Sequence, residues 1–361
     1  MICPICRKDN IVFTVDFPPL YTLKLNEHNQ IIGMHTDDID FDGHYDTYDI
    51  KNKPCDLDAF CPHCDVHFSY GISMTGMVDL TSCDIDFVPG IVVGDIIGSR
   101  FGKNNHKSKG FELFTNECKF TGNSIITAAV ANAIRLNMNS RNGLSNETLV
   151  YYMRYLGKKH MDSGYEINFR DWLLNDNATP YNSCDTGAAT RVSPCGYAAK
   201  NLEECVLLAR EVTRVTHNHP EGFKGAEATS VCIFLAKSGA TKNEIREFVN
   251  EYYYPMDFTL TQIRDAYNYD TTCQNCVPQA IQAFLECEDF EDAIRNAISI
   301  GGNSNALASI AGSIAEAYYG VPEEIKNKAK IYLNDYLILD IFNHFYLHLS
   351  PTLPIDLSSI S

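Results

Sequence analysis

The sequence is short of positive charge. Its 361 residues carry 29 Lys and Arg against 46 Asp and Glu, which gives a formal net charge of −17. A protein that holds nucleic acid over its whole surface needs clustered Lys and Arg to neutralise phosphates. The composition therefore argues against that class, and we do not expect a nucleic-acid partner.

Long apolar runs are missing as well. No stretch approaches the roughly 20 apolar residues that span a bilayer, and the first residues, Met1 to Cys6, lack a basic segment followed by an apolar run. Hydrophobic residues still make up 45% of the chain and aromatic residues 11%, enough to bury a large core. We expect a globular, cytoplasmic protein without a membrane partner.

Two regions of the chain differ in the spacing of their apolar residues. Residues 1–85 contain alternating β-type stretches, Asn10 to Phe17 and His67 to Met74, with an acidic run of six aspartates between them that we interpret as a solvated loop (Asp37 to Asp49). Residues 86–361 instead repeat apolar or small residues at three-to-four spacing, as in Val206–Val212, Ala226–Lys237, Phe290–Ile300 and Ala306–Tyr319. The sequence predicts a small β module followed by a mainly α domain whose small residues let helices approach closely.

The β module carries two matched cysteine pairs. Cys3-Pro4-Ile5-Cys6 and Cys61-Pro62-His63-Cys64 each place two thiolates in one turn. Two such turns complete a closed tetrahedral Zn²⁺ site. We therefore predict a structural zinc ion in a zinc-ribbon-like module, with Cys55 as a nearby substitute ligand.

Five segments of the helical region resemble the ADP-ribosylglycohydrolase family. In chain order they are Gly90 to Phe101, Phe120 to Ser124, Thr190 to Gly196, Thr216 to Gly222 and Ile300 to Ala306. Each alone is a weak signal, but five in family order are specific. The resemblance implies an orthogonal helical bundle with a cleft in which ADP-ribose attached to another group is cleaved with two Mg²⁺ ions.

The chain departs from this family where the family binds metal. The family's carboxylate and hydroxyl ligands fall on Thr121, Gly122, Asn123, Asn303, Asn305 and Ala306, and a further family Glu falls on Gly102. Only Thr121 keeps its ligand type. Anionic oxygens are needed to hold two Mg²⁺ ions together, so we expect the family's binuclear site not to bind Mg²⁺. The glycine and alanine replacements favour a natural pseudoenzyme over an engineered one.

The rest of the implied cleft is better preserved. The resemblance implies ligand binding by the main chain of the small-residue loop at Gly187 and Ala188, by Arg191 and by His217, and we add Asp95 of the opening helix. Asp185 places an unfavourable negative charge in the same loop for a diphosphate ligand.

Pro220 and Gly222 also allow a plainer interpretation of the Thr216 to Gly222 segment. They would end the preceding helix, while the imidazoles of His217 and His219 satisfy backbone groups.

Three hypotheses about function follow. The leading one is an inactive family member that binds ADP-ribose, an ADP-ribosylated macromolecule or a related nucleotide in a metal-free cleft. The second is an interaction or scaffold protein that uses the fold as a body for a protein partner. The third is a weak ADP-ribosyl hydrolase that employs other groups, such as Asp95 or Glu221.

Overall fold

The structure is a computed structural model, and it divides the chain into two compact units, Met1–Asp86 and Phe87–Ser361. In the first unit it describes the backbone of residues 12–15, 21–25, 31–36, 39–40, 57–61, 66–72 and 78–81. In the second it describes residues 87–102, 104–137, 143–347 and 349, without the side chains of Tyr336 and Leu347.

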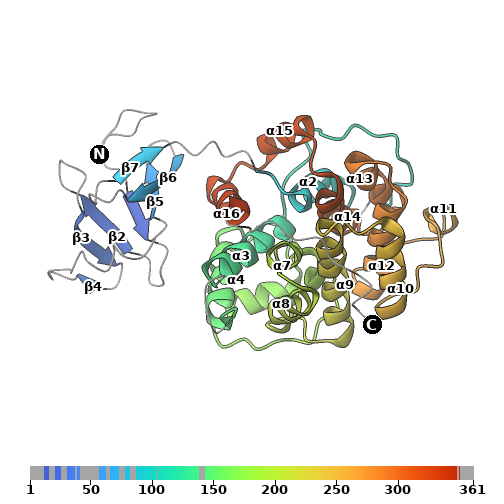
Figure 1. Cartoon of the computed structure of the whole chain (residues 1–361), viewed down its shortest axis with the longest axis horizontal. Coiled ribbons are helices and arrows are strands. Elements are labelled where there is room, and N and C mark those ends of the chain that lie inside the picture. Colours follow the sequence, from blue (N-terminus) through green and yellow to red (C-terminus); the bar gives the residue numbers. More distant parts are fainter. Residues whose placement is uncertain are drawn as a thin grey trace. The chain divides into compact units, whose positions relative to one another are not determined.

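The first unit contains a seven-stranded antiparallel sheet with strand order β4-β3-β2-β1-β5-β6-β7, drawn in blue in Figure 1. The strands are β1 (Val12–Val15), β2 (Tyr21–Leu25), β3 (Ile31–Thr36), β4 (Ile39–Asp40), β5 (Leu57–Cys61), β6 (Val66–Ile72) and β7 (Val78–Thr81). Cys61 is the last residue of β5, whereas Cys3, Cys6 and Cys64 lie outside the described residues. The zinc site therefore stays a prediction.

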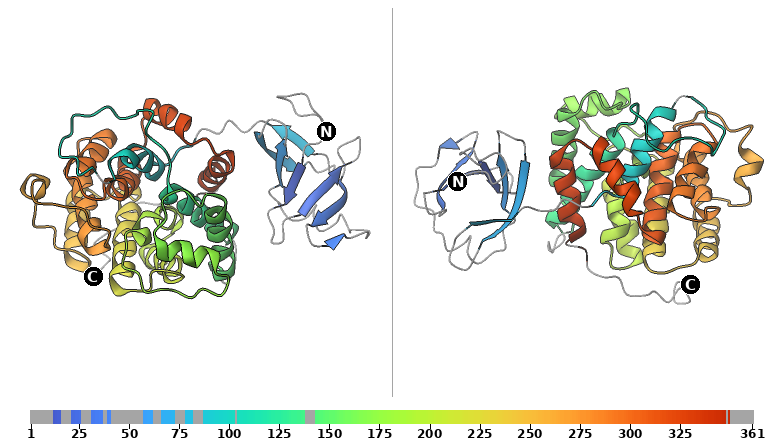
Figure 2. Two further views of the ribbon diagram at one scale, coloured as in Figure 1. Left: turned by 180° about the vertical axis from the view of Figure 1, so that it is seen from behind. Right: turned by 90° about the horizontal axis from the view of Figure 1, so that it is seen from above.

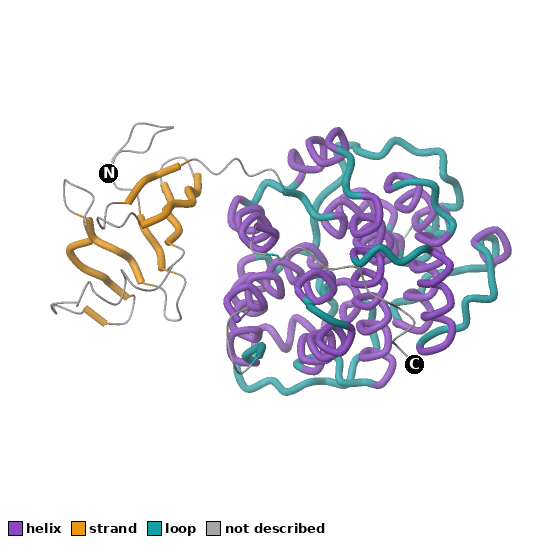
Figure 3. Tube along the Cα trace, viewed as in Figure 1, coloured by secondary structure: helices purple, strands orange, loops and turns teal. Residues whose placement is uncertain are grey.

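The second unit is mainly helical, which confirms the predicted fold class (Figure 3). Its first half comprises α2 (Gly90–Gly98), η1 (Ser99–Phe101), α3 (Gly122–Asn137), α4 (Asn146–Lys159), α5 (Ile167–Leu174), α6 (Gly187–Thr190), α7 (Ser193–Ala198) and α8 (Leu202–Arg214). Its second half comprises α9 (Pro220–Lys237), α10 (Lys242–Tyr252), α11 (Leu260–Ile263), α12 (Cys273–Leu285), α13 (Phe290–Ser299), α14 (Ser304–Tyr319), α15 (Glu323–Tyr332) and α16 (Tyr336–Leu347). Within the described residues, no helix has the length and apolar character needed to cross a membrane.

The core of the helical unit is organised around α14. This helix packs against α2, α9, α12 and α13, and its apolar residues from Ala306 to Ala315 are buried. Figure 2 shows the helices gathered around it from two further directions. Because α14 begins directly after the Gly301-Gly302-Asn303 turn, its packing fixes the position of the fifth family segment.

Helix α9 begins at Pro220, earlier than the sequence predicts. Proline has no backbone N–H, so it suits the first turn of a helix, where that group would lack an intrahelical partner. The His219 ring caps the same end, because its Nδ1 accepts a hydrogen bond from the Glu221 amide at 3.1 Å. Pro220 therefore starts α9 and does not act as the stop of α8, which already ends at Arg214.

Candidate ligand-binding site

A close crossing of α2 and α14 brings two of the motifs together. Gly90, Gly94 and Gly98 recur every four residues, so they share one face of α2. A Cβ at Gly94 would lie 2.0 Å from the Ala308 carbonyl oxygen, and one at Gly90 would lie 2.3 Å from that of Gly312. Glycine is required for this approach, which sets Asp95 of α2 against the start of α14.

Asp95 is fully buried and accepts several short hydrogen bonds. Thr121 donates to it from both its amide and its hydroxyl at 2.7 Å, and the Ser124 hydroxyl donates at 2.5 Å. Asn305 Nδ2 donates to Oδ1 at 2.6 Å. Burial raises the pKa of the Asp95 carboxyl, and these hydrogen bonds oppose that rise by stabilising the ionised form. Asp95 is predicted to bind ligand, but it does not line the pocket. It instead accepts hydrogen bonds from the pocket-lining residues Thr121 and Asn305.

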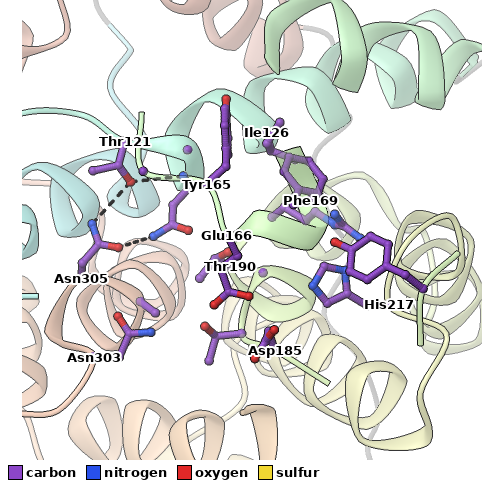
Figure 4. A pocket seen from close by; sticks show the side chains of 18 of the residues that line it. Thr121, Ile126, Tyr165, Glu166, Phe169, Asp185, Thr190, His217, Asn303 and Asn305 are labelled. Carbon is purple, nitrogen blue, oxygen red and sulfur yellow. Dashed lines mark hydrogen bonds between the residues drawn. The ribbon is translucent and has the colours of Figure 1, made fainter. Parts of the chain in front are cut away.

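The two asparagines at family metal positions are joined to each other. Asn123 Nδ2 donates to Asn305 Oδ1 at 2.5 Å (Figure 4). Asn305 Nδ2 in turn donates to Asp95. The side-chain oxygen of Asn305 and the hydroxyl proton of Thr121 are thus engaged within the protein. Asn123 and Asn305 are neutral amides that hydrogen-bond within the protein. A binuclear metal site would require anionic oxygens at these positions.

The donor set therefore does not fit two Mg²⁺ ions. Gly122 and Ala306 have no side-chain ligand, and Asn303 offers only a neutral carbonyl oxygen. Across the described residues, no group of three or more His, Cys, Asp or Glu side chains is arranged to hold a metal ion.

A pocket opens beside this network, shown in Figure 4. All six degenerate metal positions line it, as do three of the predicted ligand residues, Gly187, Arg191 and His217. Ala188 is buried and does not line the pocket. The other lining residues are Ile126, Gly164, Tyr165, Glu166, Phe169, Tyr181, Asp185, Thr186, Thr190 and Tyr269.

Arg191 is a buried cation within the pocket wall. Only 2% of the residue is exposed, and its Nη2 donates to the Val212 carbonyl at 3.3 Å and to Thr216 Oγ1 at 2.5 Å. Its Nε is buried without a hydrogen-bond partner, and no carboxylate of the described residues forms an ion pair with it. Burial lowers the pKa of Arg191 to about 10, so it stays charged at neutral pH. A buried charge in this state is best stabilised by an anion.

Arg191 also sets the proton on His217. The Arg191 guanidinium and the Thr216 hydroxyl both face His217 Nδ1, at 3.3 and 2.7 Å, and the guanidinium cannot accept a proton in return. Nδ1 is therefore the acceptor. Burial and the charge of Arg191 lower the pKa of His217, so the ring is neutral and its proton lies on Nε2.

The His217 Nε2–H group faces the small-residue loop. A Cβ added to Gly187 would come within 3.1 Å of Nε2, so glycine leaves the space in front of this donor open. The loop amides contribute less than the sequence suggests. Those of Ala188 and Ala189 donate to the carbonyls of Asp185 and Thr186.

Two carboxyl groups, those of Asp185 and Glu166, also line the pocket. The Asp185 carboxylate accepts hydrogen bonds from Thr271 Oγ1 at 2.7 Å and from Ser183 Oγ at 3.0 Å. Glu166 lies next to it (Figure 4), and desolvation together with the Asp185 carboxylate raises the pKa of Glu166 to about 8. At neutral pH the Glu166 carboxyl is therefore mostly protonated.

Glu166, Tyr165, Tyr181 and Tyr269 are pocket residues that the sequence did not indicate. They come from segments outside the five family motifs, and no local spacing marks them. Glu221, considered above as a substitute catalytic group, does not line the pocket.

Comparison with known proteins supplies the family. The family model for ADP-ribosylglycohydrolase matches residues 90–346. ADP-ribosylhydrolase ARH3 of Bos taurus is 24% identical over 200 residues, covering 42% of this chain and 54% of the relative. The Homo sapiens protein of the same name is 24% identical over 199 residues, covering 42% and 55%. The chain thus spans about half the length of these relatives.

A solved structure agrees at the level of the fold. The structure titled ADP-ribosylglycohydrolase-related protein complex superposes with a TM-score of 0.55 at 18% identity, covering 72% of this chain and 94% of that chain. Since the family model spans most of the chain and four of the five motifs line one pocket, the protein belongs to the ADP-ribosylglycohydrolase family.

Proposed function

We propose that this protein is a catalytically inactive ADP-ribosylglycohydrolase-like protein that captures ADP-ribose, an ADP-ribosylated macromolecule or a related nucleotide in a metal-free cleft. The family's chemistry depends on metal ions as Lewis acids and as activators of water. The network of Asn123, Asn305 and Asp95 offers them no adequate ligand set. Without the metals, hydrolysis falls towards the uncatalysed rate.

The observation that carries the binding proposal is the pairing of Arg191 with His217. A buried guanidinium without a carboxylate partner and a neutral imidazole with its N–H towards Gly187 form an anion-binding wall. Replacing metal-binding carboxylates by amides removes negative charge from the same cleft. An anionic nucleotide can then bind without the metal ions that would otherwise have to neutralise those carboxylates.

The direct test is calorimetric titration with ADP-ribose in EDTA. We expect saturable binding that added Mg²⁺ does not change. His217→Ala should weaken it by about 10-fold or more, because a hydrogen bond to a charged group contributes about 1.5–3 kcal/mol. His219→Ala is the matched control: it removes an imidazole of the same segment that caps α9 and does not line the pocket.

Two other outcomes would replace this proposal. A folded protein that gives no heat with ADP-ribose would favour the interaction or scaffold role, in which a protein partner binds elsewhere on the fold. Release of ADP-ribose from a modified protein at about 1 per second or faster would instead show an active hydrolase.

We also propose that the protein acts in the cytoplasm. The cysteines that the structure describes in the helical unit are free thiols, the state that a reducing compartment maintains.

A further inference from the structure

Gly122, where the family holds a carboxylate, faces the ring of Tyr165. A Cβ built on Gly122 would lie 2.5 Å from Tyr165 Cε1 and 2.7 Å from Cδ1. Real Cβ atoms do not approach ring carbons so closely, because van der Waals repulsion rises steeply below about 3.5 Å. No side chain larger than that of glycine fits at position 122 while the ring keeps its place.

The ring is held in this position by packing and by the backbone beside it. Tyr165 packs against Phe169 with ring centroids 5.3 Å apart, and its hydroxyl is buried without a hydrogen-bond partner. The Gly122 amide donates to the Ser163 carbonyl at 2.9 Å, which ties the start of α3 to the segment that carries Tyr165. Figure 4 shows the ring at the edge of the pocket. The contact between Gly122 and Tyr165 is therefore part of the local fold.

We propose that the Tyr165 ring occupies the space that the lost metal ligand at position 122 would need. The ring forms an aromatic part of the pocket wall there. Gly122 and Tyr165 are then a coupled pair: the carboxylate cannot return unless the ring leaves. This goes beyond the loss of ligands seen in the sequence, and it does not depend on which ligand the pocket binds.

The coupling is measured with Gly122→Asp, Tyr165→Ala and the double variant in thermal unfolding. Overpacking a buried site costs about 1–3 kcal/mol, and one kcal/mol shifts the melting temperature of a domain of this size by roughly 2–4 °C. We expect Gly122→Asp alone to lower the melting temperature by about 5 °C. In the Tyr165→Ala background the same change should have little effect, because the space is then open.

Gly102→Asp is the matched control. It adds the same side chain at another position where the family has an acid, but a Cβ there meets only the Ser99 carbonyl oxygen at 3.8 Å. We expect its melting temperature to stay within about 2 °C of the wild type. Gly122→Ala serves if Gly122→Asp does not fold, since a Cβ alone creates the same clash. If Gly122→Asp and Gly122→Ala are both as stable as the wild type, the proposal is wrong.

Metal binding gives a second readout. With G122D, N123D, N303D, N305D and A306T combined, we expect Mn²⁺ titration to show little binding while Tyr165 is present. Tight binding, at least tenfold stronger, should follow when Y165A is added. Equal Mn²⁺ affinity with and without Tyr165 would overturn the proposal, whereas failure of ADP-ribose to bind would leave it unaffected.

Discussion

The substitution Asn305→Asp tests whether internal hydrogen bonds have replaced metal ions in this cleft. In the wild type, Asn305 Nδ2 donates to Asp95 Oδ1 at 2.6 Å. The variant places a carboxylate oxygen at that contact, so a donor becomes a second acceptor. The opposite contact survives, because Asn123 Nδ2 can still donate to residue 305.

The size of the effect follows from two competing costs. Two ionised carboxylates at this distance repel by about 6 kcal/mol at an effective dielectric constant of about 20. Keeping one proton on the pair at pH 7 instead costs about 4 kcal/mol, since the unfolded pKa of Asp is about 3.9 and each pH unit is worth about 1.4 kcal/mol. Protonation is the cheaper solution. We expect N305D to lose about 4 kcal/mol of unfolding free energy at pH 7.

The loss should depend on pH in a defined direction. The folded pKa of the acid pair is raised above its unfolded value, so the variant matches the wild type below about pH 4 and loses about 1.4 kcal/mol per unit as the pH rises. Urea unfolding followed by the helical circular dichroism signal, in EDTA at several pH values, measures this slope against the wild type. N303D adds the same charge to the pocket wall without touching the hydrogen bonds of Asp95 and should cost less than about 1 kcal/mol. Equal stability of N305D and N303D at pH 7 would refute the reasoning.

Three further predictions concern metal and pH. Millimolar Mg²⁺ should leave the melting temperature of the wild type unchanged, because binding to the folded state would be needed to raise it; a rise of several degrees would contradict the metal-free cleft. The chain should contain one Zn²⁺, and Cys61→Ser should lose it, in elemental analysis; purified protein without zinc would exclude the predicted site. Affinity for ADP-ribose should fall between pH 7 and pH 9, because Glu166, with a pKa of about 8, is protonated below that value and becomes a second negative charge beside Asp185 above it. Glu166→Gln should flatten this profile, and a rise in affinity with pH would show that the acid pair does not face the anion.

The sequence by itself determined the family and the loss of its metal ligands. Both depend on residue types within short motifs, and a family carboxylate replaced by Asn303 or a family hydroxyl replaced by Ala306 is visible in the sequence alone. The close approach of helices was also predictable, since Gly90, Gly94 and Gly98 recur at the helical period and the structure seats them on the backbone of α14. The sequence also predicted three ligand residues that line the pocket, Gly187, Arg191 and His217.

Only the tertiary structure decided what surrounds those motifs. Tyr165 lies 43 positions after Gly122, and no local pattern indicates that its ring takes the space of a side chain there. Asp95 was predicted to touch the ligand, but four hydrogen-bond donations from Thr121, Ser124 and Asn305 hold it behind the wall. The Glu166–Asp185 pair likewise arises from folding, because a pKa raised by a neighbouring charge depends on distance in space and not on separation along the chain.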